Sequence, residues 1–184
     1  MTEVAALSQG RFVVPELVGT HFHLREGDVV ADFGAGSGYF MKTLSKLVGS
    51  EGRVHACEIQ KNLIETIADV ARREHLGNIE ILWGDLEELN GSKVPTDSLD
   101  AGILVNTLFQ LEDKDTAFEE IKRALRNGGK LFVIDWSESF GGLGPQPDQV
   151  ITESDAKAVA EQHGFTFERS FDTGDHHYGL AFRL

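Results

Sequence analysis

Short apolar runs alternate with longer amphipathic stretches along most of this chain. The apolar runs predict strands, and the run from Leu99 to Val105 is almost unbroken, as expected of a strand buried on both faces. The amphipathic stretches carry apolar residues at helical spacing, for example Leu63, Ile67 and Val70 in a helix predicted over 61–75. In chain order, the predicted strands cover residues 28–33, 53–59, 79–83, 99–105, 130–136, 165–171 and 178–184.

Capping and turn residues place further helices between these strands. Pro15 suits the first turn of a short helix over about 15–23, and a helix over 39–48 follows the first strand. Asp113 and Thr152 are predicted N-caps of two later helices, which end near Asn127 and Gly164. The polar stretch 85–98 and the Gly/Pro-rich stretch 140–149 are predicted loops.

The order of these elements predicts the fold class. Five strand–helix units favour a parallel sheet with helices on both faces, because parallel strands need a crossover connection. The last two predicted strands have no helix between them, so they should pair as an antiparallel hairpin. We therefore expect an α/β fold with a doubly wound, Rossmann-like seven-stranded sheet, mostly parallel with an antiparallel last strand.

Composition and charge exclude several functional classes. The chain has 184 residues, 41% hydrophobic and 26% charged, which is typical of a globular protein. A net charge of −13 argues against the broad basic surface of a nucleic-acid-binding protein. The single cysteine, Cys57, lies in an apolar run, so we expect a buried thiol and no disulfide framework. No leader-like segment and no run of about 18 apolar residues is found, which predicts a cytoplasmic protein without a membrane span.

The clearest chemical signal is the turn after the first predicted strand. The apolar run ends in Asp32, and Gly34, Gly36 and Gly38 follow at alternate positions. Such glycines allow a tight turn and leave room above the backbone for a ligand. Glu58 ends the next predicted strand, where the ribose of a nucleoside seated on this turn would lie. These residues predict an adenosine-containing ligand.

The spacing of the glycines distinguishes between two kinds of adenosine ligand. A dinucleotide-binding turn needs the pattern G-x-G-x-x-G, but the third glycine here comes one residue early and Tyr39 occupies its position. Asp32 would repel a pyrophosphate, whereas it would attract an ammonium group. The residues therefore favour an adenosine whose far end is cationic, and an NAD(P)-dependent oxidoreductase is the less favoured alternative.

The segment from Asp32 to Gly38 resembles the acidic-x-Gly-x-Gly-x-Gly motif of the class I S-adenosylmethionine-dependent methyltransferases. The resemblance covers about 28–136 closely and looks nearest to the small-molecule branch typified by the ubiquinone/menaquinone C-methyltransferases. This chain is shorter than that branch and lacks most of its substrate-cap insertions. The resemblance implies S-adenosyl-L-methionine as cofactor and methyl transfer to a small-molecule acceptor. A non-catalytic accessory subunit that binds the cofactor is the alternative.

The same resemblance implies cofactor contacts at three strand ends. Glu58 would accept both ribose hydroxyls, Asp85 would face the adenine amino group, and Asn106 would lie beside the methionine moiety. Ile59 and Leu86 can enclose the adenine ring. The expected cofactor-binding set is Asp32, Gly34, Ala35, Gly36, Ser37, Gly38, Glu58, Ile59, Gly84, Asp85, Leu86 and Asn106.

The acceptor side carries fewer signals. His176 and His177 precede a strand predicted to start at the ligand-binding edge, and either can act as a base near neutral pH, with His177 preferred. Neighbouring strand residues point to opposite faces, so this pair is poorly suited to a metal and we expect none. Arg11 and Phe12 can cover the site, and Phe109 and Trp136 can form its wall.

The motif content also bears on the acceptor and on domain organisation. The Asn-Pro-Pro-Tyr motif of enzymes that methylate nucleic-acid amino groups is absent, which again argues against a nucleic-acid partner. We expect a single methyltransferase domain over 1–184. Its predicted parts are an N-terminal lid helix (1–27), a cofactor-binding core (28–136), and a C-terminal helix and hairpin (137–184).

Overall fold

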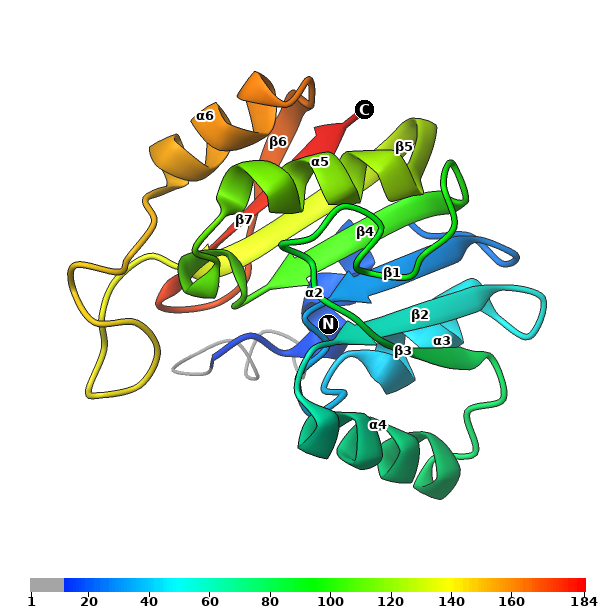
Figure 1. Ribbon diagram of the computed structural model, residues 1–184. Coiled ribbons are helices and arrows are strands. Elements are labelled where there is room, and N and C mark those ends of the chain that lie inside the picture. Colours follow the sequence, from blue (N-terminus) through cyan, green and yellow to red (C-terminus); the bar gives the residue numbers. More distant parts are fainter. Residues whose placement is uncertain (1–11) are drawn as a thin grey trace.

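A seven-stranded sheet forms the centre of the molecule (Figure 1). The computed structural model describes residues 12–184. The strands are β1 (Val29–Phe33), β2 (Arg53–Glu58), β3 (Ile79–Trp83), β4 (Leu99–Val105), β5 (Leu125–Trp136), β6 (Thr166–Phe171) and β7 (His177–Arg183). Their order across the sheet is β3-β2-β1-β4-β5-β7-β6. Only β7 runs against its neighbours, pairing antiparallel with both β5 and β6, so the predicted sheet is confirmed.

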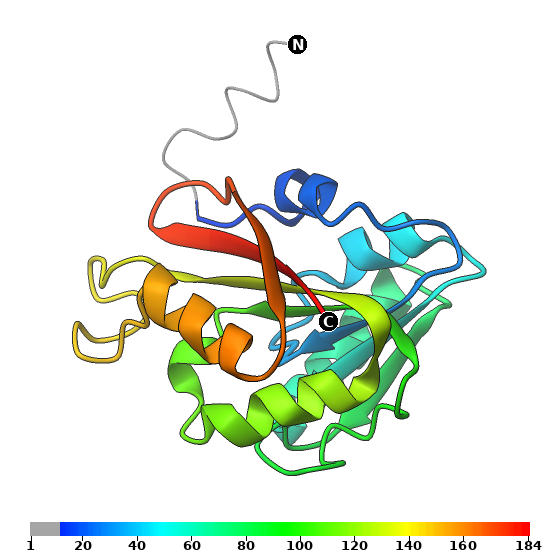
Figure 2. The same cartoon turned by 90° about the horizontal axis from the view of Figure 1, so that it is seen from above.

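Helices cover both faces of this sheet. They are α2 (Pro15–Val18), the 3-10 turn η1 (Gly19–His21), α3 (Met41–Val48), α4 (Lys61–Arg73), the 3-10 turn η2 (Leu108–Gln110), α5 (Lys114–Ala124) and α6 (Glu153–Gln162). Seen from above, α2 and α3 lie on one side of the strands, and α5 and α6 lie on the other (Figure 2). Within residues 12–184, no helix has the length and apolar character to cross a bilayer.

The alternation of side chains along the strands builds one core on each face. Phe33 and Leu104 point to the face covered by α5 and α6, where Phe118 is also buried. Val30 and Ile103 point to the opposite face, which is covered by the N-terminal segment, α3 and α4. Because both faces are buried, the central strands are apolar at successive positions and not only at alternate ones.

The predicted helix starts are confirmed, and one predicted helix end is wrong. The side chain of Asp113 accepts a hydrogen bond from the Thr116 amide at 3.0 Å, and Thr152 accepts one from the Asp155 amide at 3.1 Å. However, α5 ends at Ala124 instead of continuing to Asn127. The reason is strand pairing: β5 starts immediately after α5, and the backbone farther on, at Gly128 and Gly129, exchanges hydrogen bonds with Leu184.

The N-terminal helix packs against the sheet. Its predicted range of 15–23 is divided between α2 and η1. Val18 and Phe22 are fully or almost fully buried, and the Phe22 ring centroid lies 4.8 Å from that of Phe132 in β5. Of the residues predicted to cover the site, Arg11 lies outside the described residues. Phe12 is described and partly exposed.

Candidate cofactor site

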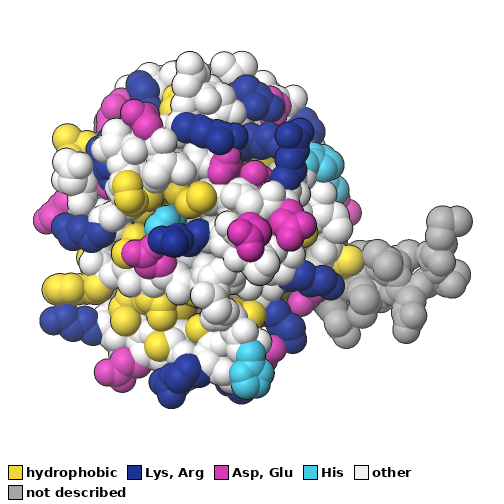
Figure 3. Space-filling view, turned by 90° about the vertical axis from the view of Figure 1, so that its right-hand side faces the viewer, with side chains coloured by type: hydrophobic (Ala, Val, Ile, Leu, Met, Phe, Trp, Pro, Cys, Tyr) yellow, Lys and Arg dark blue, Asp and Glu magenta, His cyan; other side chains and the backbone are white. Residues whose placement is uncertain are grey.

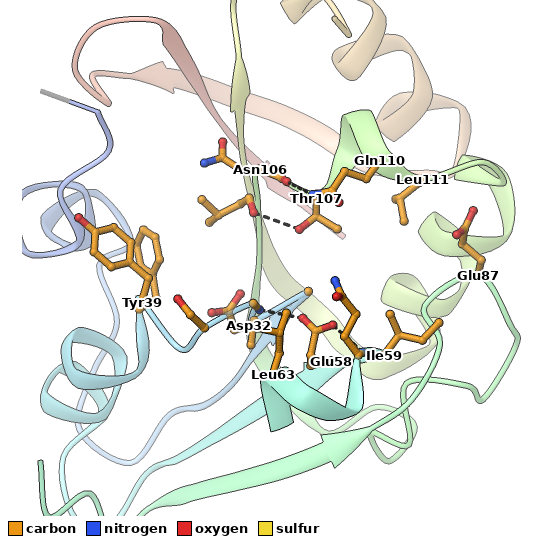
Figure 4. A pocket seen from close by; sticks show the side chains of 17 residues that line it. Asp32, Tyr39, Glu58, Ile59, Leu63, Glu87, Asn106, Thr107, Gln110 and Leu111 are labelled. Atoms are coloured by element: carbon orange, nitrogen blue, oxygen red, sulfur yellow. Dashed lines mark hydrogen bonds between the residues drawn. The ribbon is translucent and has the colours of Figure 1, made fainter. Parts of the chain in front are cut away.

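A cavity of about 460 Å³ opens at the carboxyl ends of β1, β2 and β4. The strand order reverses between β1 and β4, and ligands of open α/β sheets bind at this kind of switch point. Figure 4 shows Asp32 and Glu58 on one side of the cavity, and Asn106 and Thr107 on the other. The expected cofactor residues that line this cavity are Asp32, Gly34, Ala35, Gly36, Ser37, Glu58, Ile59 and Asn106.

The three glycines of the turn have three different surroundings. All three have positive φ angles, +81° at Gly34, +56° at Gly36 and +82° at Gly38, which glycine adopts at little cost. A Cβ on Gly34 would lie 2.5 Å from the Thr107 Oγ1, so this glycine lets the turn approach the segment after β4. A Cβ on Gly36 would meet no atom within 4 Å, so the cavity lies open above it.

Gly38 faces the protein interior instead of the cavity. A Cβ there would approach Met41 at 3.3 Å and Ile67 at 3.5 Å, so its missing side chain permits close packing of the turn against α3 and α4. It is the one glycine of the motif that does not line the cavity. Its observed role is therefore in the shape of the turn, and its predicted role in cofactor binding stays a prediction.

Two buried carboxylates stand side by side beneath the turn. Glu58 is 5% exposed, and its Oε2 and Oε1 accept hydrogen bonds of 2.8 Å from the amides of Gly36 and Gln60. Each of these oxygens keeps lone-pair capacity for a further donor, such as a ribose hydroxyl. Asp32 is 2% exposed, and burial together with the nearby charge of Glu58 raises its pKa to about 7. A cationic ligand would relieve both effects by stabilising the ionised form.

A smaller cavity of about 80 Å³ continues the site toward β3. It shares Gly34, Glu58 and Ile59 with the larger cavity, and its own lining includes the predicted adenine-side residues Gly84, Asp85 and Leu86. The Asp85 carboxylate accepts a hydrogen bond from the Glu87 amide at 2.8 Å, which fixes the loop after β3. Ile59 is 53% exposed, so its apolar side chain is free to pack against a planar ligand.

Asn106 is held in an uncommon conformation beside the large cavity. Its φ is +52°, and its amide donates to the Ile134 carbonyl at 2.8 Å. Its side-chain Oδ1 is buried and has no hydrogen-bond partner among the described residues. A buried acceptor without a partner at a cavity wall makes Asn106 a candidate contact for a ligand donor.

The large cavity is also lined by residues that the sequence analysis did not predict as cofactor contacts. Tyr39 entered the argument only as a mismatch to the dinucleotide pattern, yet it lines the cavity, and its hydroxyl donates to the Val13 carbonyl at 3.2 Å. Thr107 and Gln110 line it from the turn after β4, and Leu63 lines it from α4. The only sequence signal for them is their position within a few residues of a strand's carboxyl end.

The two histidines lie at the same edge of the sheet but outside both cavities. β6 is parallel to the central strands, so β7 does start at the carboxyl edge, as the sequence predicts. The ring of His177 lies 4.3 Å from that of Trp136, and its buried Nε2 has no partner among residues 12–184. His176 stacks on Phe140 at 3.8 Å, and its Nδ1 lies 2.7 Å from a Glu138 oxygen. Neither ring lines the cavities described above.

Burial sets the protonation of His177. Loss of solvent lowers the pKa of His177, which keeps the ring neutral near pH 7 and leaves Nε2 able to accept a proton. The Phe12 ring packs against both histidines, with its centroid 6.0 Å from that of His176 and 6.3 Å from that of His177. The histidines therefore belong to an aromatic cluster, which consists of Phe12, Trp136, Phe140, His176 and His177.

Comparison with known proteins agrees with this geometry. A family described as "methyltransferase domain" matches residues 31–133. A ubiquinone/menaquinone biosynthesis C-methyltransferase UbiE from Hydrogenovibrio crunogenus is 32% identical over 116 residues, which cover 62% of this chain and 44% of the relative. The UbiE protein of Marinomonas sp. is 30% identical, with 62% and 45% covered. The chain thus spans less than half the length of these curated relatives.

Solved structures extend the similarity to the whole chain. The structure of a SAM-dependent methyltransferase from Aquifex aeolicus has a TM-score of 0.86 at 26% identity and covers 100% of this chain and 97% of its own. The [4+2]-cyclase SpnF has a TM-score of 0.77 at 17% identity, with 92% and 82% covered, and shares the fold. The chain therefore belongs to the methyltransferase domain family, and its recognition as a class I S-adenosylmethionine-dependent methyltransferase is confirmed.

Proposed function

We propose that this chain binds S-adenosyl-L-methionine in the cavity above β1, β2 and β4 and transfers its methyl group to a small-molecule acceptor. The observation that carries the proposal is the pairing of Asp32 and Glu58 beneath a glycine turn that is open at Gly36. The buried Asp32 carboxylate suits a ligand with an ammonium group. The remaining acceptor capacity of Glu58 suits a diol.

The other cavity residues fit the remaining parts of this cofactor. Asp85, Leu86 and Ile59 supply a polar edge and two apolar surfaces for an adenine ring. The free acceptor of Asn106 suits a donor of the methionine moiety. The cofactor supplies an electrophilic methyl on a sulfonium, so the task of the protein is alignment and exclusion of water.

The aromatic cluster supports the acceptor side of the proposal. Phe12 and Phe140 are 40% and 41% exposed, and the Phe12 ring packs against both Phe140 and the buried Trp136 at the end of β5. An apolar or aromatic acceptor would gain contact area there. The neutral His177 is the candidate base for an acceptor that must lose a proton. Curated relatives named for ubiquinone and menaquinone biosynthesis agree with a small-molecule acceptor.

A non-catalytic cofactor-binding subunit is the second candidate. The observation that favours it is that neither histidine lines the cofactor cavity, which leaves the cavity without a histidine base. The match to the methyltransferase domain family argues against the alternative of an NAD(P)-dependent oxidoreductase. The single-domain organisation, the cytoplasmic location and the absence of a nucleic-acid partner stay predictions, and the acidic composition supports the last of these.

A binding and turnover experiment separates these functions. S-adenosylhomocysteine and NADH are each titrated into the protein by calorimetry, and we expect only the first to bind. Turnover is then followed as transfer of labelled methyl to a panel of phenols, quinols and amines. Binding without transfer to any acceptor, alone or with added cell extract, would favour the accessory subunit. Binding of NADH alone would contradict the proposal.

A further inference from the structure

A third cavity, also lined by charged side chains, lies at the amino ends of the parallel strands, on the edge of the sheet opposite the cofactor cavity. It has a volume of about 160 Å³, and segments before β1, at the start of β4, along β5 and at the end of β7 converge on it. Its charged lining consists of Arg25, Arg126, Lys130 and Arg183 with Asp28 and Asp100. Figure 3 faces this edge, and Lys and Arg side chains gather in a band across its upper part.

The two aspartates are occupied by contacts within the protein. Asp28 accepts a hydrogen bond from the Arg25 amide at 2.8 Å. Asp100 accepts one from the Val29 amide at 2.7 Å and forms an ion pair with Arg126. The cavity lining therefore carries four cationic side chains and two carboxylates, although the chain as a whole carries a charge of −13.

Two of the cations are placed directly opposite each other. Lys130 and Arg183 are register partners across the antiparallel pair of β5 and β7. Like charges at such positions destabilise a sheet. Arg183 is held by Glu168 at 2.6 Å and donates to the Gly128 carbonyl at 3.0 Å. Among residues 12–184, no carboxylate lies within 4.0 Å of the Lys130 ammonium or the Arg25 guanidinium.

We propose that this cavity binds a phosphate group, either inorganic phosphate or the monoester of a small metabolite. Arginine forks and a lysine point charge are the side chains that phosphate oxygens pair with most favourably. An anion between Lys130 and Arg183 would also relieve their mutual repulsion. A long polyanion is disfavoured because the acidic remainder of the surface would repel it.

The test uses the full chain and substitutes the two cations that have no carboxylate partner in the described part of the chain, Arg25 and Lys130. Inorganic phosphate and glycerol phosphate are titrated separately at constant ionic strength, with binding followed by amide chemical shifts and calorimetry. The variant is Arg25→Gln/Lys130→Gln, which leaves the structural contacts of Arg126 and Arg183 intact. Arg53→Gln is the matched control, because Arg53 is an exposed cation at the same end of the sheet but outside this cavity, paired with Glu80.

We expect phosphate to bind the wild-type chain and the control equally and the double variant about tenfold or more weakly, as loss of charge-assisted hydrogen bonds implies. Tighter binding of the monoester would identify a metabolite as the ligand. Affinity for S-adenosylhomocysteine should be the same in all three proteins, which shows that they are folded. Absence of phosphate binding, or equal binding by the double variant, would overturn the proposal. Neither result would bear on the cofactor cavity.

Discussion

The cofactor cavity and the aromatic cluster lie at the same edge of one sheet but are built in different ways. The cavity is formed by backbone and short polar side chains that directly follow β1, β2 and β4, with the amides of Gly36 and Gln60 held by Glu58. The cluster is formed by large side chains from three separate segments, which include Phe12, Phe140 and His177. Because strand ends fix the first and loop packing fixes the second, substitutions should have sharper effects in the cavity.

The largest effect is expected at Gly36. Gly36→Val would place a branched side chain in the open space above the turn and at a φ of +56°. Because the ligand and the new side chain compete for that space, we expect binding of S-adenosylhomocysteine to be lost in calorimetry. The backbone penalty should be about 1–2 kcal/mol, measured as the free energy of unfolding.

Gly128→Val is the matched control for this prediction. Gly128 has a φ of +77°, and a Cβ there would also meet nothing within 4 Å, but it lies at the opposite end of the sheet. It should cost similar stability and leave cofactor binding intact. Normal binding by Gly36→Val would mean that the glycines serve only the turn.

Glu58 should show the next largest effect. Glu58→Gln removes the charge and points an amide donor at one of two backbone donors, those of Gly36 and Gln60. Loss of hydrogen bonds to a charged group, worth about 1.5–3 kcal/mol each, predicts a fall in affinity of about tenfold to a hundredfold. The affinity is measured by calorimetry with S-adenosylhomocysteine. Glu80→Gln is the control, because Glu80 is a partly exposed residue in β3 that does not line the cavity. An unchanged affinity in a folded variant would remove Glu58 from the site.

Asp32 should make cofactor binding depend on pH. Its folded-state pKa is about 7, so a cationic ligand that requires the ionised carboxylate must displace a proton below that pH. We expect affinity to fall by up to about tenfold per pH unit below 7, measured by calorimetry between pH 5.5 and 8. Asp32→Asn should flatten this profile. An equally steep profile in Asp32→Asn would assign the proton to another group.

The same pKa predicts the pH dependence of stability in the absence of cofactor. A raised pKa means that the folded chain binds more protons than the unfolded chain between the ordinary aspartate pKa of 3.8 and about 7. Stability from this group is therefore fully present at low pH and is lost as pH rises through 7. Asp32→Asn should stabilise the cofactor-free protein above pH 7, as measured by chemical denaturation.

The sequence predicted the residues of the cofactor cavity better than those of the aromatic cluster. The position of Asp32, Glu58 and Asp85 at the cavities could be predicted because each directly ends or follows an apolar strand, and the carboxyl ends of parallel strands meet at one edge. Tyr39 and Gln110 could not, because their place in the cavity depends on side-chain direction after a turn. The end of α5 was misplaced because pairing of the following residues with neighbouring strands overrides the glycine stop signal.

For the acceptor side, the sequence predicted only which edge of the sheet the residues occupy. The antiparallel direction of β7 correctly placed His177 at the carboxyl end of the sheet. Its contact with Trp136 and its distance from the cavity depend on the packing of Phe12 and of loop 137–152, which has no periodic pattern. Loop packing of this kind leaves no regular signal in a sequence.

The smallest effect is expected at His177, and it tests whether the aromatic cluster takes part in the chemistry. His177→Ala should lower turnover by less than about tenfold, below the usual range for a general base, because the sulfonium is already activated and the ring does not line the cavity. Affinity for S-adenosylmethionine should stay within a few-fold. His176→Ala is the control, since His176 is engaged by Glu138 and Phe140.

If His177 acts as a base, its loss should also remove the acidic limb of the pH–rate profile. Equal rates and identical profiles for both variants would leave alignment by the cavity as the sole source of catalysis.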